Sequence, residues 1–89
     1  MKTVVFTDYL RFRAGLRGFD LDAVGEIVLH STERYEDTVS GRQVAVGPYG
    51  NGLALIPYEV DADAIIPVTV HMTSRQQIRY RLRSGRFRL

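Results

Sequence analysis

The 89-residue chain contains no cysteine, a single lysine and only two histidines. The absence of cysteine excludes disulfide bonds and cysteine-ligated metal sites. His30 and His71 lie far apart in the sequence, without acidic residues at the spacing of metal ligands, so we expect neither a metal nor a cofactor. The apolar run Val4–Phe6 breaks at Thr7 and is too short for a signal peptide or a membrane-spanning helix. We therefore expect a cytoplasmic protein that does not enter a membrane.

Positive charge is concentrated at one end of the chain. The segment from Thr73 to Leu89 contains six arginines and no acidic residue, which leaves six cations against ten acids, about −4, in residues 1–72. A guanidinium group matches phosphate and carboxylate oxygens, and the nearby rings of Tyr80 and Phe87 can stack on bases. The pattern favours RNA or an acidic protein as partner, although a solvated basic helix face is the simpler alternative. The six residues are Arg75, Arg79, Arg81, Arg83, Arg86 and Arg88.

Capping residues and apolar spacing predict two helices near the start of the chain. A short apolar run over residues 2–6 is typical of a strand, and Thr7 or Asp8 can then cap a helix that ends at Gly18. A second helix is predicted from Leu21 to His30, because its apolar residues recur at helical spacing.

From Arg34 onward the apolar period changes to two, which indicates strands. The predicted strands cover residues 35–38, 42–46, 53–60 and 64–72, joined by a turn at 39–41, a glycine-rich loop at 47–52 and a turn at 61–63. Pro57 and Pro67 each remove a ladder donor and predict bulges or an irregular edge. Thr73 or Ser74 can cap a last helix over residues 75–83, although residues 79–83 also fit an extended edge strand.

These elements predict one α+β domain, residues 1–89, with a basic C-terminal segment at 79–89. Four or five strands form a twisted antiparallel sheet, two N-terminal helices cover one face, and the other face is open to a ligand. Ile78 and Leu82 would dock the terminal helix on the sheet. A domain this small buries only about 60–65% of its unfolded surface, so a homodimer is an option. The expected core is Val24, Ile27, Val28, Val44, Val46, Leu55, Val68 and Val70.

Short segments along nearly the whole chain form an ordered pattern. The segments are Thr7–Tyr9, Arg13 with Arg17–Phe19, Tyr35–Thr38 with Gly41–Arg42, Val68–His71 with Arg75, and Gly85–Phe87. This pattern resembles a family of small proteins of unknown function. That family is related to the RelE/ParE toxin superfamily and to BrnT-like toxins, so the resemblance implies a small RelE-like fold. It also implies a ribosome-dependent or free endonuclease for messenger RNA, or a degenerate descendant, neutralised by a small acidic antitoxin.

The resemblance implies a cleavage that uses no metal. The 2′-hydroxyl of RNA then attacks the phosphate with the help of a base, an acid and cations that hold the developing charge. His71 is the candidate base or acid, Arg75 the phosphate ligand and Tyr80 a second proton-transfer or stacking group. We expect His71 and Arg75 to converge where the last strand meets the last helix. Arg79, Arg81, Arg83, Arg86, Arg88 and Arg42 are the candidate RNA-binding residues.

Each of these residues has a structural alternative. A lone histidine on a strand is more often a hydrogen-bonded structural group than a catalyst. Arg11, Arg13 and Arg17 fit a solvated helix face or ion pairs with Asp8 and Asp20, and a patch shared with the C-terminal arginines is a further option. The sequence therefore leaves two functions open. One is a toxin-like RNA-binding protein or ribonuclease. The other is a non-catalytic module that binds an acidic protein or nucleic acid through its basic C-terminal helix.

Overall fold

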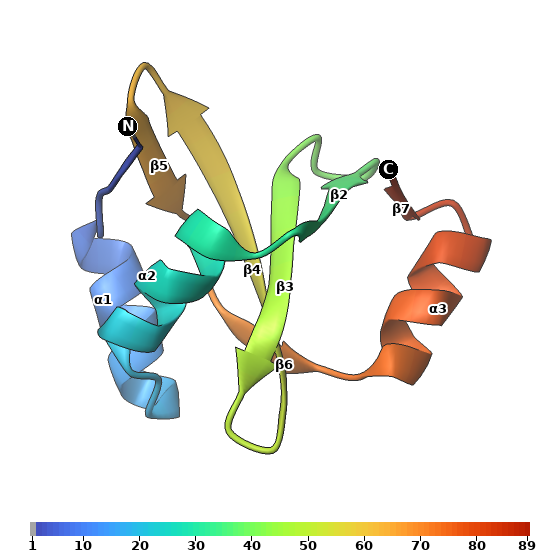
Figure 1. The fold of residues 1–89 in the computed structure, drawn as a ribbon, viewed down its shortest axis with the longest axis horizontal. Coiled ribbons are helices and arrows are strands. Elements are labelled where there is room, and N and C mark those ends of the chain that lie inside the picture. The colour runs from blue at the N-terminus through green and yellow to red at the C-terminus, as the bar shows by residue number, and fades with distance from the viewer. Residues whose placement is uncertain (1) are drawn as a thin grey trace.

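The computed structural model describes residues 2–89, and Figure 1 shows three helices around a curved sheet. The predicted α+β class is confirmed. The sheet has seven strands rather than four or five, because short strands from both ends of the chain join its edges. The elements are β1 (Thr3–Val4), α1 (Asp8–Arg17), α2 (Leu21–His30), β2 (Glu33–Asp37), β3 (Gln43–Tyr49), β4 (Gly52–Asp61), β5 (Ala64–Pro67), β6 (His71–Thr73), α3 (Arg75–Arg83) and β7 (Phe87–Arg88).

The strands follow the order β1-β5-β4-β3-β2-β7, and β6 also pairs with β4. Every neighbouring pair is antiparallel except β1 with β5, which is parallel and makes the sheet mixed. The single strand predicted over residues 64–72 is two strands, because the chain leaves the ladder after Pro67. The long strand β4 pairs with both, using Tyr58–Asp61 for β5 and Leu53–Leu55 for β6.

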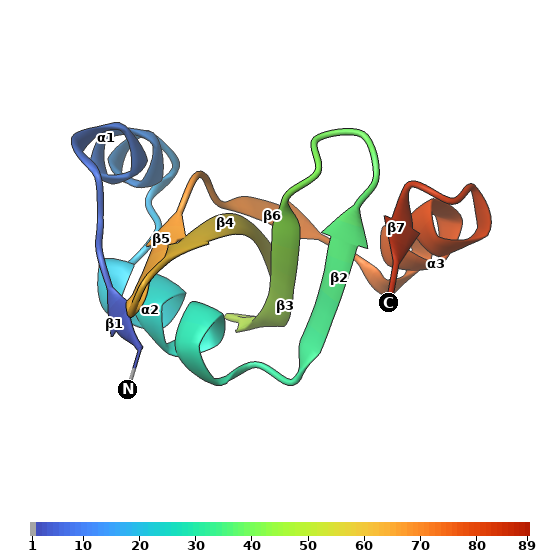
Figure 2. The same cartoon turned by 90° about the horizontal axis from the view of Figure 1, so that it is seen from above.

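Helices α1 and α2 have the predicted bounds and lie together on one face of the sheet (Figure 2). The Thr7 hydroxyl accepts a hydrogen bond from the Leu10 N–H at 3.1 Å, and Gly18 ends α1 in the left-handed conformation at φ 73°. Asp20 caps α2 through the N–H of Asp22. The core beneath these helices contains Leu10, Ala14, Val24, Ile27, Val28, Ala45, Ala54, Ile56, Tyr58, Ile65 and Val70.

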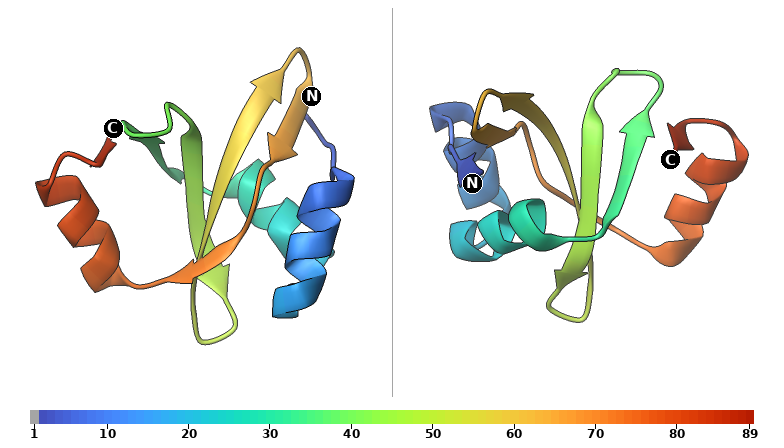
Figure 3. Two further views of the ribbon diagram at one scale, coloured as in Figure 1. Left: turned by 180° about the vertical axis from the view of Figure 1, so that it is seen from behind. Right: turned by 45° about the horizontal axis from the view of Figure 1, so that its top comes forward.

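The sheet face expected to be open to a ligand is instead covered in part by α3, opposite α1 and α2 (Figures 2 and 3). Strand alternation sends Val44 and Val46 to this face and Ala45 to the other. Ile78 of α3 and Phe87 of β7 pack over them in a second core with Leu55. Leu82, in contrast, is 38% exposed, so the expectation that it docks α3 on the sheet is wrong.

The predicted core is confirmed apart from Val68, which is only half-buried. Residues 68–70 form no strand, and of the two valines in this segment only Val70 packs into the core. The glycine-rich loop predicted at 47–52 is mostly strand: β3 continues to Tyr49, β4 begins at Gly52, and only two residues form the turn. A Cβ at Gly47 would lie 2.8 Å from the Ile27 Cγ2 atom. Glycine is therefore required there for close approach of α2 to the sheet.

The terminal segment forms the helix Arg75–Arg83, so the alternative of an edge strand over 79–83 is wrong. Gly85, at φ 80°, reverses the chain and lets Phe87 and Arg88 pair with Asp37 and Glu36 of β2. No helix within residues 2–89 is both long and apolar enough to cross a membrane.

Candidate functional site

Three of the six C-terminal arginines are paired with acids of β2. These contacts form because β7 runs alongside β2 and the start of α3 lies over its other end. Half of the positive charge predicted to be available for a partner is therefore neutralised inside the molecule. The pairs are Arg75 with Glu33 at 2.7 Å, Arg86 with Asp37 at 2.8 Å and Arg88 with Glu36 at 2.5 Å.

The pair of Arg86 and Asp37 is the most enclosed of the three. Asp37 is 7% exposed, and its carboxylate accepts hydrogen bonds from Nε and Nη2 of Arg86 and from the N–H groups of Val39 and Ser40. The bond from Arg86 is the main reason that the pKa of Asp37 lies below its usual range. In the same way, the bond from Arg75 lowers the pKa of Glu33. These predicted site arginines hold the C-terminal segment on β2.

Arg42, another predicted RNA-binding residue, also faces an acid. Its Nε atom lies 3.8 Å from the Glu59 carboxylate of the neighbouring strand β4. At this distance, and with both side chains largely exposed, the contact is a weak surface ion pair. Because the Glu59 carboxylate lies beside it, the charge of Arg42 is nevertheless offset when seen from a distance.

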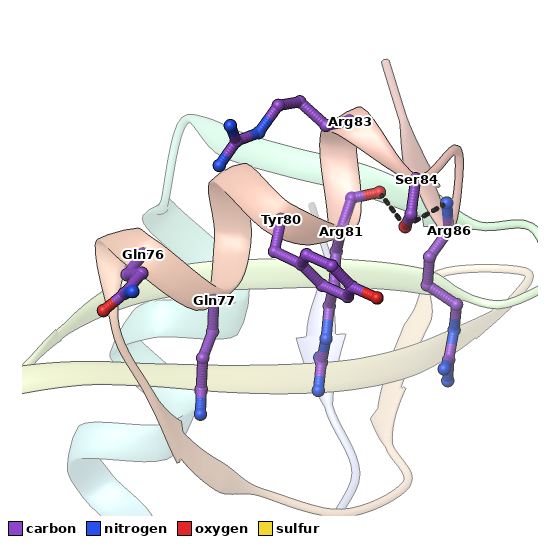
Figure 4. Close-up of a pocket in the computed structure, with 7 residues that line it drawn as sticks. All are labelled: Gln76, Gln77, Tyr80, Arg81, Arg83, Ser84 and Arg86. Atoms are coloured by element: carbon purple, nitrogen blue, oxygen red, sulfur yellow. Dashed lines mark hydrogen bonds between the residues drawn. The ribbon is translucent and has the colours of Figure 1, made fainter.

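Arg79, Arg81 and Arg83 of α3 make no ion pair within residues 2–89. Arg81 and Arg83 border a groove of about 870 Å³ beside α3 (Figure 4). Tyr80, which is 67% exposed, presents its ring in the same groove. Figure 4 shows Arg81 extending in the same direction as Gln77 and Arg86, whereas Arg83 points away from them. The groove is lined by Gln76, Gln77, Tyr80, Arg81, Arg83, Ser84 and Arg86.

His71 is half-buried in β6, where it pairs with Leu55 of β4. Nη1 of Arg17, at the end of α1, lies 2.6 Å from His71 Nδ1 and donates a second hydrogen bond to the Val70 carbonyl at 3.0 Å. Burial lowers the pKa of His71, and the charges of Arg17, Arg13 and Arg81 lower it further. The charged groups that act on this ring are thus all arginines.

The contact with Arg17 also decides the tautomer of His71. A guanidinium group offers only donors, so Nδ1 must accept and the neutral ring carries its proton on Nε2. In this state Nε2 can donate a hydrogen bond to an anion but cannot take a proton. The arrangement is suited to holding a phosphate oxygen, and Nδ1 becomes a base only when Arg17 releases it.

The structure does not bring His71 and Arg75 together as expected. Arg75 points to Glu33 on β2, whereas His71 faces Arg17 and a small cavity of about 290 Å³. His71 and Tyr80 are closer to a common site, because Gln77 and Arg81 line both the cavity beside His71 and the groove beside Tyr80. The site thus extends from α1 over β6 to the inner edge of α3.

Arg13 and Arg17 belong to this site, although the sequence placed them first on a solvated helix face. Arg17 neither pairs with Asp20 nor stands free, and Arg13 stacks over the Tyr9 ring at 5.9 Å from its centroid. The sequence pointed to these residues only through the three closely spaced arginines of α1. Their interpretation as a patch shared with the C-terminal arginines was one option among others. Only the position of α1 beside β6 could select that option.

Residues 2–89 contain no group of three or more histidine, aspartate or glutamate side chains arranged to hold a metal. Comparison of the chain with protein-family models, with curated proteins and with solved structures found no match.

Proposed function

We propose that this chain is a toxin-like RNA-binding protein whose RNA site is the basic surface around His71. The observation that carries the proposal is the position of two arginines at one half-buried imidazole: Arg17 of α1 lies 2.6 Å from His71 Nδ1, and Arg81 of α3 lines the same cavity as His71. Arg13 of α1 adds a third positive charge that acts on the ring. No ion pair with a carboxylate occupies these three arginines within residues 2–89. Such a cluster places uncompensated positive charge beside a hydrogen-bond donor, which is the chemistry that a phosphate requires.

Besides the phosphate site at His71, single-stranded RNA needs a surface for its backbone and a ring on which a base can stack, and the neighbouring groove on α3 supplies both. Arg81 and Arg83 would track the phosphate backbone, and the exposed ring of Tyr80 would stack on a base. An RNA strand that enters at Arg17 and leaves along α3 would contact both the cavity beside His71 and the groove beside Tyr80, because Gln77 and Arg81 line both. Single-stranded RNA therefore fits the site better than a rigid duplex, whose bases are not available for stacking.

We also propose that the domain is of the RelE-like type and acts in the cytoplasm. The resemblance of short sequence segments supports this assignment, as does the order of the elements: a strand, two helices on one sheet face, antiparallel strands and a C-terminal helix. The resemblance further implies messenger RNA, ribosome-bound or free, as target and a small acidic antitoxin as partner.

Metal-independent cleavage of RNA is the finer form of this proposal. A phosphate that draws Arg17 away from His71 would free Nδ1, and the neutral ring could then take the proton of the 2′-hydroxyl. Arg81 would hold the charge that develops on phosphorus, and the Tyr80 hydroxyl would donate to the leaving oxygen. Arg75 has no part in this version, because its guanidinium is bound to Glu33.

The test is overexpression in a bacterial host, with growth and messenger-RNA integrity followed together. In the host, a ribonuclease should stop growth and degrade messenger RNA. The purified protein should cleave RNA in the presence of EDTA. His71→Ala should lower the cleavage rate by about 100-fold, the typical value of a positioned proton-transfer group. His30→Ala is the matched control, since His30 is an exposed residue of α2, outside the proposed site, that lies 3.8 Å from Glu26.

RNA binding measured on the same purified proteins separates the proposal of RNA binding from the proposal of RNA cleavage. Binding without cleavage or growth arrest would leave a non-catalytic module that holds RNA through its basic surface. Failure to bind single-stranded RNA at low salt would contradict the RNA-binding proposal itself. Cleavage that depends on an added metal would contradict the mechanism.

A further inference from the structure

Strand β6 has an outer edge that no other strand of residues 2–89 covers. Its only partner in the sheet is β4, and Figure 3 shows β6, in orange, between α1 and α3. An uncovered strand edge presents backbone N–H and C=O groups that lack partners within the sheet. Such groups can bind a ligand, so the residues of β6 that point them outward define a candidate binding site.

The register of β4 fixes the direction in which its backbone groups point. In an antiparallel ladder, successive residues point their N–H and C=O alternately toward the partner strand and away from it. The Val68 N–H donates to the Pro57 carbonyl at 2.8 Å, on the side of β4 that β5 and β6 share. The pairing of β4 with β3 is unbroken over this stretch, so the alternation continues. Leu55 and Leu53 therefore point their backbone groups to that same side.

Met72 consequently points its N–H and C=O away from β4. Its neighbours His71 and Thr73 are in register with Leu55 and Leu53, so the backbone groups of these two neighbours point inward. Met72 lies between them, and its own N–H and C=O have no hydrogen-bond partner within residues 2–89. The residue is 50% exposed, as a position on an open edge should be.

The free edge is only one residue long. On one side of Met72, the Val70 carbonyl accepts a hydrogen bond from Nη1 of Arg17 at 3.0 Å. On the other side, the Ser74 carbonyl accepts one from the Ile78 N–H at 3.0 Å. An added β-strand needs several free groups in a row, so neither an extended peptide nor β6 of a second copy fits this edge. A second copy would also bring Arg17 close to its own counterpart, with repulsion between the two charges.

One donor beside one acceptor matches the edge of a nucleobase. The Watson–Crick edge of every base has a donor next to an acceptor, and this edge is accessible in unpaired RNA. Met72 lines the cavity of about 290 Å³ together with His71 and Arg81, so a base at Met72 would adjoin the proposed phosphate site. We propose that the free N–H and C=O of Met72 bind the Watson–Crick edge of an unpaired base. Because this base belongs to RNA, the base site rests on the proposed function.

The first experiment compares two labelled RNAs on the unchanged protein: oligouridylate, and the same chain built from N3-methyluridine. The methyl group replaces the N3–H donor and blocks the Watson–Crick edge, whereas the number of phosphate charges stays the same. We expect the methylated RNA to bind at least about fivefold more weakly, because a matched donor and acceptor discriminate between bases by about this much or more. Equal binding of the two RNAs would overturn the base site.

The second experiment removes the backbone donor by Met72→Pro. Proline is tolerated on an edge strand where the N–H faces away from the ladder, and Met72→Ala is the matched control that loses the side chain but keeps the N–H. Met72→Pro should bind oligouridylate about three- to tenfold more weakly than Met72→Ala, the usual effect of one hydrogen bond. The two variants should bind the methylated RNA equally, because its Watson–Crick edge is already blocked.

The outcomes separate the base site from the proposed function. Equal binding of oligouridylate by Met72→Pro and Met72→Ala would overturn the base site and leave RNA binding in place. Failure of the unchanged protein to bind either RNA at low salt would overturn RNA binding and the base site together. A dimer in light scattering that Met72→Pro abolishes would also overturn the base site, since a second copy would then occupy the edge. If circular dichroism shows that Met72→Pro does not fold, the comparison of the two RNAs on the unchanged protein decides.

Discussion

The sorting of the arginines into paired and unpaired groups predicts which of them govern RNA binding. Two triple variants test this point, each with arginine replaced by glutamine, so that each lowers the formal net charge of +2 by the same three units. Any difference between them must come from position rather than from total charge. The unpaired set is Arg17, Arg81 and Arg83, and the paired set is Arg42, Arg75 and Arg88.

The expected effect follows from the release of counterions. Each phosphate contact with single-stranded RNA contributes about −0.7 to the slope of log affinity against log salt, so the loss of three contacts should flatten the slope by about 2. Over a fourfold rise in salt, from about 50 to about 200 mM, the unpaired variant should therefore lose roughly 20-fold less affinity than the unchanged protein. The paired variant should keep the original slope, because its arginines already hold carboxylates.

Fluorescence anisotropy with a labelled single-stranded RNA, repeated over a series of salt concentrations, measures these slopes. Circular dichroism of each variant checks that the fold is retained. Equal flattening in both variants would mean that net charge alone governs binding, and the site would lose its support. A larger effect in the paired variant would refute the assignment of the RNA surface to α1, β6 and α3.

Three further predictions concern stability. Asp37→Asn should lower the free energy of unfolding by about 2 kcal/mol in urea titrations, because it weakens four hydrogen bonds to a buried charge. An unchanged urea midpoint would mean that the contact with Arg86 contributes nothing to stability. The pKa values of Asp37 and Glu33 lie below their ordinary 3.8 and 4.5. The stability that these two carboxylates give the folded protein should therefore be complete above about pH 5 and be lost as the pH falls through the lowered folded-state pKa values. A thermal unfolding temperature that does not change between about pH 5 and about pH 3 would contradict this. Gly47→Ala should destabilise the folded protein by about 1–3 kcal/mol, because the new Cβ would clash with Ile27. Gly15→Ala, in open space on α1, should instead stabilise the fold by up to about 1 kcal/mol. A change of the same sign in both variants would refute the packing argument.

The sequence by itself determined the elements whose causes are local. Thr7 and Ser74, each one of two predicted capping residues, cap α1 and α3, and the bounds of α2 match the apolar spacing. The hairpin of β2 and β3 and the face shared by Val44 and Val46 follow from the period of two. Each of these features depends on residues only a few positions apart, where backbone geometry leaves few alternatives.

Features that depend on distant segments were decided only by the tertiary structure. Two-residue strands such as β1 and β7 carry almost no periodic signal, so their pairing with β5 and β2 could not be predicted. The same holds for α3, whose docking over Val44 and Val46 depends on the path of the chain after β6.

The candidate site shows this division most clearly. The sequence identified a C-terminal block of arginines beside His71 as the basic end of the chain. It could not show that Arg75 would meet Glu33, 42 residues away, or that Arg17 would meet His71 from a distance of 54 residues. Whether a guanidinium is neutralised or available depends on which carboxylate lies within a few ångströms, and that distance is a property of the folded chain.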